Sequence, residues 1–165
     1  WQQGINPAEL AQRLTRRVGG RAFSFPAPLL APSPEFAATL TALPEVSDAL
    51  KLARAADTLL FGLGGLDWTT SQLQDSLSDQ EKRQLVERGA VGDIGARFFD
   101  TRGRQVTSDV DRRVIGLSLD DMSHASQRLV LAAGKSKLKA LRIALSVGIA
   151  TALCTDSATA RGLLD

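Results

Sequence analysis

The sequence is poor in the two residues that most often build metal and redox sites. Its 165 residues include one cysteine, Cys154, and one histidine, His124. One cysteine excludes an internal disulfide and a cysteine metal cluster, and one histidine excludes a metal site made of several histidines. A Ser–His–Asp triad would have to use His124. We therefore expect no metal and no other cofactor.

Both residues have ordinary structural interpretations, which the sequence favours. His124 falls on a predicted helix, where we expect a surface or partly buried side chain. Cys154 falls in an apolar strand, where we expect a small packed thiol rather than a nucleophile. A single thiol also fits a reducing compartment, so the expected location is the cytoplasm.

The chain also lacks long apolar runs and a concentration of charge of one sign. No window is apolar for the length needed to cross a bilayer, so no membrane partner is expected. The 20 basic and 18 acidic residues are spread along the chain, without the basic cluster of a nucleic-acid surface. The opening residues WQQGIN lack the features of a signal peptide and an initiator Met, which is typical of an internal fragment.

Two glycine-containing segments are close to nucleotide-binding motifs without matching them. GLGG at 62–65 lacks the third glycine of the dinucleotide fingerprint and the helix directly behind it. GKSK at 134–137 lacks the leading glycine spacing of a Walker A loop. Neither segment therefore predicts a nucleotide cofactor.

Strand and helix patterns alternate along the chain, which is long enough for one domain. Thr58 to Leu63 is a continuous apolar run that predicts a central parallel strand covered on both faces. This alternation predicts an α/β fold with an open, mostly parallel sheet, helices on both faces and a ligand site outside the carboxyl ends of the strands. The other predicted strands are 21–25, 114–117, 128–133 and 150–154. Predicted helices begin at Pro7, Pro34, Pro44, Asp79, Leu119, Gly134 and Ser157.

The segment GAVGDIGARFFD at 89–100 carries the first candidate for a ligand site. Glycines allow backbone to approach a ligand closely, and Asp93 among them has no local cation to neutralise it. This pattern suits a polyhydroxylated ligand. The alternative is that Gly89 caps a helix, Gly92 eases a tight turn and Asp93 is solvated at a strand start.

Three glycine-bearing turns follow predicted strands and can converge at one edge of a parallel sheet. They are Gly64–Gly65, Gly89–Gly92 and Gly134. The last leads into a helix whose first turn offers free amides together with Lys135 and Lys137, which is a plausible phosphate cradle. Equally, strand-ending glycines are routine and first-turn lysines are common solvated residues, so this alternative stays open.

Several segments in this order resemble the effector-binding domain of the SorC type of bacterial sugar-responsive transcriptional regulators. That resemblance implies a Rossmann-like three-layer α/β/α fold related to sugar-phosphate isomerases and deaminases. It also implies a phosphorylated sugar effector that alters DNA binding by a separate helix-turn-helix domain. The segments are GGRAFSFPAPLL at 19–30, LLFGLGGL at 59–66, GAVGDIGARFFDTRG at 89–103, VIGLSLDDM at 114–122, LAAGKSKLKAL at 131–141 and ALCTDSATARGLL at 152–164.

The resemblance also assigns roles and identifies what differs. Family patterns place an acid after the GAVG run and a lysine after the glycine turn, here Asp93 and Lys137, whereas Ala133 stands where the family usually has a second glycine. The helix-turn-helix and the first strand with its Gly/Thr-rich turn are absent, so 1–165 is expected to be an effector-binding domain incomplete at its N-terminus. We expect a homo-oligomer, dimer or tetramer, without catalysis. The expected sugar-phosphate site comprises Gly64, Gly65, Gly92, Asp93, Gly134 and Lys137.

The rival hypothesis is a sugar-phosphate isomerase or deaminase-like enzyme. In that case Asp93 would act as the base and Lys137 as an electrostatic stabiliser. Such an enzyme would be expected to carry a second acid or a histidine near the site. The one histidine falls outside the glycine-rich turns.

Overall fold

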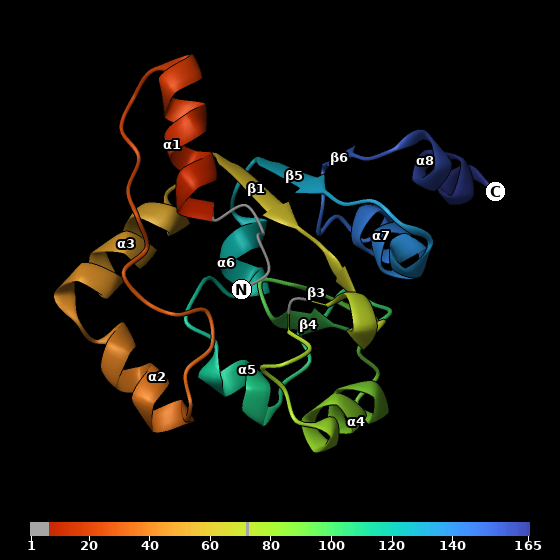
Figure 1. Ribbon diagram of the computed structural model, residues 1–165, viewed down its shortest axis with the longest axis horizontal. Coiled ribbons are helices and arrows are strands. Elements are labelled where there is room, and N and C mark those ends of the chain that lie inside the picture. Colours follow the sequence, from red (N-terminus) through yellow and green to blue (C-terminus); the bar gives the residue numbers. More distant parts are fainter. Residues whose placement is uncertain (1–6, 72) are drawn as a thin grey trace.

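The computed structural model describes residues 7–71 and 73–165 as a mixed α/β fold (Figure 1). The helices are α1 (Pro7–Val18), α2 (Pro34–Thr41), α3 (Pro44–Arg54), α4 (Asp79–Glu87), α5 (Asp109–Arg113), α6 (Leu119–Ser123), α7 (Leu138–Ser146) and α8 (Ser157–Leu164), with short 3-10 helices η1 (Trp68–Thr70) and η2 (Lys135–Lys137). The strands are β1 (Thr58–Gly62), β2 (Gly64–Gly65), β3 (Gly92–Ile94), β4 (Arg97–Phe99), β5 (Gln127–Leu131) and β6 (Ala152–Cys154).

A parallel sheet forms the centre of the fold, as the alternating pattern predicts. Its order is β1-β5-β6, and Leu60 of β1 pairs with Leu129 of β5. The prediction that β1 is central is wrong, because β5 holds that place and β1 lies at an edge. The prediction that β1 is covered on both faces is also wrong, since its residues alternate between exposed and half-buried and Leu60 is 45% exposed.

A second, antiparallel sheet holds the glycine-rich segments. Its order is β2-β3-β4, with Gly64 opposite Asp93 and Gly65 opposite Gly92. The β3–β4 hairpin places Phe98 and Phe99 on opposite faces, as the period-2 geometry of a strand requires. Both rings are fully buried, each in a different part of the core.

These two parts of the core hold the hairpin between the parallel sheet and α4. Phe99 packs in one cluster with Val130 of β5 and Leu141 of α7, and Phe98 packs in another with Leu85 of α4. Fully burying an aromatic side chain contributes about 1.5–3 kcal/mol. The hairpin that carries Asp93 is therefore anchored from both sides.

Two predicted strands do not form. Residues 21–25 alternate in the sequence but pair with no strand among the described residues, and Phe23 is 62% exposed. At 114–117 only Val114 forms a bridge, to Leu30, and carbonyls that another strand would need accept hydrogen bonds from Arg97 instead. Alternation alone does not make a strand without a hydrogen-bonding neighbour.

Several helix boundaries match the sequence signals. Ser78 and Ser118 each form a capping box, with Glu81 and Asp121 respectively, as predicted. His124 ends α6 as an exposed residue, which agrees with its expected surface position. The expectation of a packed thiol at Cys154 is wrong, because this residue is exposed on the edge strand β6.

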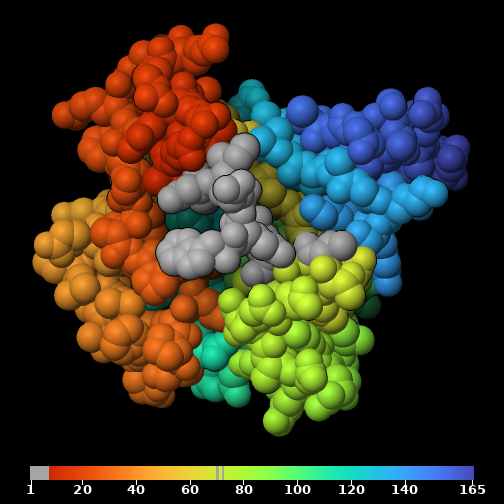
Figure 2. Space-filling model, in the orientation of Figure 1, coloured from red at the N-terminus to blue at the C-terminus, as the bar shows by residue number. Residues whose placement is uncertain are grey.

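The helices are distributed around the sheets rather than gathered on one side. In Figure 1, α1, α2 and α3 lie to the left of the parallel sheet, and α7 and α8 lie together on its right. Figure 2 shows α1 (red) and the C-terminal residues (blue) as two projections of the surface. The apolar face predicted for α1 is partly open, with Leu10, Leu14 and Val18 between 41% and 73% exposed. Within the described part of the chain, no helix combines the length and apolar character needed to span a membrane.

Candidate functional site

The glycine segments and η2 meet at the carboxyl edge of the parallel sheet. β2 begins two residues after β1 ends, and η2 follows β5, the parallel neighbour of β1. The carboxyl ends of neighbouring parallel strands lie at the same edge, so β2 and η2 are brought side by side. A Cβ added to Gly65 would lie 2.6 Å from the Ser136 carbonyl oxygen and 3.6 Å from Cα of Lys137. Gly65 is therefore required for this close approach.

Glycines at two further positions make room for the candidate acid and its strand. A Cβ on Gly64 would lie 2.0 Å from Oδ1 of Asp93, and a Cβ on Gly92 would lie 2.6 Å from Cβ of Ala140 on α7. Gly92 thus serves close packing within β3, and the alternative that it eases a tight turn is wrong. Gly89, in contrast, follows the end of α4 with φ of +83°, as the capping alternative proposed.

Asp93 is a buried carboxylate rather than a solvated one. It is 8% exposed, and its Oδ2 accepts a hydrogen bond of 3.0 Å from the Ala96 amide. Burial raises the pKa of the Asp93 carboxyl to about 6, although the Ala96 amide and the positive charge of Lys137 act to lower it. Its Oδ1 accepts no hydrogen bond from the described residues and lies against Gly64. A ligand hydroxyl is a suitable donor for this oxygen.

Lys137 ends η2 next to β2, with its side chain half-buried. Its amide donates back to the Gly134 carbonyl at 3.1 Å, and the described residues place no carboxylate within ion-pair distance of its ammonium. The amides of Lys135 and Ser136 occupy the first positions of η2, where backbone N–H groups have no partner within the helix. Lys137 and these amides form a donor set for an anion.

Gly134 directly precedes η2 and has a bonding partner on α8. Its amide donates a hydrogen bond of 2.8 Å to Oγ1 of Thr159, which is 2% exposed on α8. This amide is therefore already used, whereas the space beside the Gly134 Cα is open, and a ligand contact at Gly134 stays a prediction. The other five predicted residues, Gly64, Gly65, Gly92, Asp93 and Lys137, are brought together at one edge.

Sequence reasoning missed the residues that hold this edge in place. Thr159 fixes the glycine turn before η2, and the Ala96 amide orients Asp93. The only local signal for Ala96 was its place after Gly95, between two short apolar segments, which is compatible with a two-residue hairpin turn. Among the described side chains, no group of three or more His, Cys, Asp and Glu could hold a metal ion.

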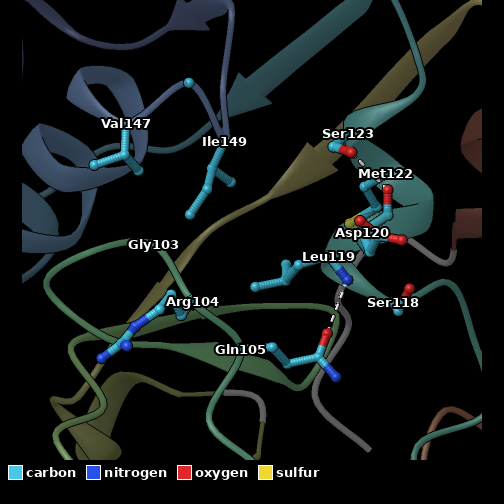
Figure 3. Close-up of a pocket in the computed structure, with 11 residues that line it drawn as sticks. Gly103, Arg104, Gln105, Ser118, Leu119, Asp120, Met122, Ser123, Val147 and Ile149 are labelled. Carbon is cyan, nitrogen blue, oxygen red and sulfur yellow. Dashed lines mark hydrogen bonds between the residues drawn. The ribbon is translucent and has the colours of Figure 1, made fainter.

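A cavity of about 470 Å³ lies elsewhere, at the amino-terminal edge of the parallel sheet (Figure 3). Its walls come from the turn after β4, from α6 and from the loop before β6, and none of the six predicted residues lines it. Two of its polar side chains are already bonded: Gln105 accepts from the Leu119 amide and Arg104 pairs with Asp100. The lining residues are Gly103, Arg104, Gln105, Ser118, Leu119, Asp120, Met122, Ser123, Val147, Gly148 and Ile149.

Similarity to known proteins extends over nearly the whole chain. A family model described as "Putative sugar-binding domain" matches residues 2–165. The transcriptional regulator LsrR of Escherichia coli is 36% identical over 143 residues, which cover 84% of this chain and 45% of that protein. LsrR of Klebsiella pneumoniae is 32% identical over 143 residues, which cover 84% of this chain and 44% of that protein. The chain thus spans a little under half the length of these relatives.

Solved structures share the fold. A sugar-binding domain of a transcriptional repressor from Vibrio fischeri, so described, superposes with a TM-score of 0.85 at 26% identity, covering 97% of this chain and 64% of that one. The full-length sorbitol operon regulator SorC from Klebsiella pneumoniae superposes with a TM-score of 0.86 at 21% identity, covering 96% of this chain and 52% of that one. At this identity the likeness supports the fold alone. The chain therefore belongs to the sugar-binding domain family that this model describes, and its relatives at 32–36% identity are transcriptional regulators.

Proposed function

We propose that this chain binds a phosphorylated sugar at the edge formed by β2, β3 and η2. The observation that carries the proposal is a buried carboxylate, Asp93, near enough to the ammonium of Lys137 for that charge to act on its pKa, with its Oδ1 left against Gly64. Burying an acid is unfavourable unless a partner compensates it. A ligand with both hydroxyl groups and an anion supplies partners for Asp93 and Lys137 at once.

Each group of the site has a defined task in this proposal. Oδ1 of Asp93 accepts hydrogen bonds from sugar hydroxyls, because a carboxylate is an acceptor with several lone pairs. Lys137 and the first amides of η2 bind the phosphate, since a cation and free amides at a helix start both favour negative charge. Gly64 and Gly65 let β2 pack closely against Asp93 and η2, which brings these groups to one edge.

At the level of the whole protein, we propose that the bound sugar controls transcription. The relatives named LsrR are transcriptional regulators, and the family model describes a sugar-binding domain. DNA contact would come from a separate helix-turn-helix domain, because the charges of this chain are dispersed. The sugar-bound and sugar-free forms of this domain would then differ in how they arrange the DNA-binding domains.

We propose binding without catalysis. A carboxyl with a pKa of about 6 could act as a general base, which is the feature that the isomerase alternative would use. A second proton-transfer group is needed for that chemistry. The histidine lies at the end of α6, which precedes the amino end of β5 and so belongs to the opposite edge of the sheet. Asp156 is engaged as the cap of α8, where it accepts from the Thr159 amide.

The test is calorimetry on the full-length protein with phosphorylated pentoses and hexoses, the matching free sugars and inorganic phosphate. Lys137→Ala should weaken binding of the phosphorylated sugar about ten-fold or more, since a charge-assisted contact contributes about 1.5–3 kcal/mol. Lys139→Ala is the matched control, because Lys139 is an exposed lysine two positions along. Equal effects of both substitutions, or no binding of any phosphorylated sugar, would refute the proposal.

A further inference from the structure

Arg97 is a buried arginine with an unusually complete set of partners. It begins β4, directly after the hairpin turn, and is 9% exposed. Its guanidinium donates to the carbonyl oxygens of four residues and to one carboxylate. The acceptors are the carbonyls of Asp111 (2.7 Å), Val114 (3.3 Å), Gly116 (3.2 Å) and Leu117 (3.1 Å), and Oδ1 of Asp111 (2.9 Å).

These contacts attach the segment from Asp111 to Leu117 to the start of β4. The same Asp111 oxygen also accepts from Nε2 of Gln105 at 2.9 Å, so the network extends to the chain that follows the hairpin. A planar guanidinium with five donors suits this arrangement, and an ammonium on a flexible stem cannot reproduce it. The position of Arg97 is therefore strongly determined.

The turn immediately before Arg97 is strained. Gly95 has φ of +54° and Ala96 has φ of +61°, the left-handed values that a type I′ hairpin turn requires at both central positions. Alanine is disfavoured in this region by about 1–2 kcal/mol, and such conformations persist only where the surroundings over-determine them. Ala96 is fully buried, and Arg97 pairs with Ile94 across the turn.

The strained turn is connected directly to the candidate ligand site. The Ala96 amide donates to Oδ2 of Asp93, which leaves Oδ1 of the same carboxylate against Gly64. Rotation of the Ala96 peptide out of the left-handed region would turn this amide away. The direction of the Asp93 carboxylate therefore depends on the conformation of Ala96.

We propose that Arg97 is a positioning residue for Asp93: its contacts with the 111–117 segment hold Ala96 in the left-handed conformation in which the Ala96 amide orients the carboxylate. The effect on sugar binding rests on the proposed function, whereas the effect on Asp93 itself does not. The nearby charge that acts on Asp93 is Lys137 of η2, and the Arg97 charge is paired with Asp111.

The test compares Arg97→Lys with Arg128→Lys in the ligand-free full-length protein. Arg128 is a suitable control, because its half-buried guanidinium likewise donates to several backbone carbonyls, at the opposite edge of the parallel sheet. The readout is the pH titration of the Asp93 carboxyl carbon by NMR. Arg97→Lys should raise the Asp93 pKa above its value of about 6, because the Ala96 hydrogen bond that lowers it is weakened while the positive charge is kept. Arg128→Lys should leave the titration unchanged.

An unchanged Asp93 titration in Arg97→Lys, or an equal change in Arg128→Lys, would overturn the proposal. If Arg97→Lys does not fold, Gln105→Ala gives a milder loss of the same network without changing any charge and is expected to raise the Asp93 pKa in the same direction, and no rise would again overturn it. Where the wild type binds a phosphorylated sugar, Arg97→Lys should also weaken that binding about ten-fold, which is of the order of one hydrogen bond. A shifted titration in a protein that binds no sugar would refute the proposed function and leave the positioning role standing.

Discussion

Replacing Asp93 with asparagine is expected to stabilise the ligand-free protein at neutral pH. Asparagine keeps the shape of the side chain and an oxygen that can accept from the Ala96 amide, and it removes the buried negative charge. Most substitutions of a buried, hydrogen-bonded polar residue destabilise a protein. The opposite sign is expected here because the charge itself is unfavourable in the absence of ligand.

The magnitude follows from the raised pKa. The pKa of Asp93 is about 6 in the folded protein, and its reference value is 3.8. This difference of about 2 units means that the ionised carboxylate destabilises the folded state by about 3 kcal/mol. The asparagine amide would face Gly64 without a partner, and an unsatisfied buried donor costs about 1–3 kcal/mol. The expected net increase in the free energy of unfolding at pH 7.5 is therefore roughly 0–2 kcal/mol.

The sign of the pH dependence is fixed by the direction of the shift. The folded protein binds the Asp93 proton more tightly than the unfolded chain does. The ionised carboxylate therefore lowers the free energy of unfolding by its full amount above pH 6 and has no such effect below about pH 4. Urea unfolding of wild type and Asp93→Asn at pH 7.5, 6 and 4.5 measures this. The difference in free energy of unfolding between Asp93→Asn and wild type should become steadily smaller as the pH falls.

Asp100 provides a control of opposite sign. The Arg104 amide donates to its carboxylate, which lowers the pKa of the Asp100 carboxyl and favours its ionised form in the folded protein. Asp100→Asn should therefore destabilise the protein at pH 7.5. This loss in free energy of unfolding should disappear as the pH falls through the pKa that Asp100 has in the folded protein. The reasoning would be refuted if Asp93→Asn were less stable than wild type at pH 7.5. It would also be refuted if the difference in free energy of unfolding between the two proteins did not change with pH.

Two further predictions concern the site and the assembly. Gly64→Ala places a methyl group 2.0 Å from Oδ1 of Asp93, so it should displace the carboxylate and weaken sugar-phosphate binding in calorimetry by ten-fold or more; unchanged affinity would remove Asp93 from the site. The full-length protein should sediment as a dimer or tetramer, because regulators that read two DNA half-sites are commonly two-fold symmetric, and a purely monomeric species would contradict this.

Local signals in the sequence predicted the elements that depend on short-range chemistry. Proline at the starts of α2 and α3 and the capping boxes at Ser78 and Ser118 lie where the sequence places them. A parallel sheet was also predicted from apolar runs separated by helices, and β1 and β5 are parallel neighbours, although the sequence did not predict which strands pair. These features are determined by residues within one turn or one strand.

Features that depend on distant partners could not be predicted in the same way. The alternation at 21–25 and the apolar residues at 114–117 are compatible with strands, but a strand needs a hydrogen-bonding neighbour. In the second segment, carbonyl oxygens accept hydrogen bonds from Arg97 instead. The roles of Thr159 and Ala96 depend on contacts between separate segments and on a left-handed backbone that alanine rarely adopts. The edge position of β1 likewise depends on the order of the strands.

The most direct measurement for the central claim is NMR mapping of the sugar-phosphate contact on the full-length protein. A phosphorylated sugar should perturb the Asp93 carboxyl carbon and the amides of Gly64 and Ser136, and the matching free sugar should perturb the Ser136 amide less. Perturbations confined to the cavity at the amino-terminal edge, at Leu119 and Ile149, with Asp93 unchanged, would contradict the assignment of the site.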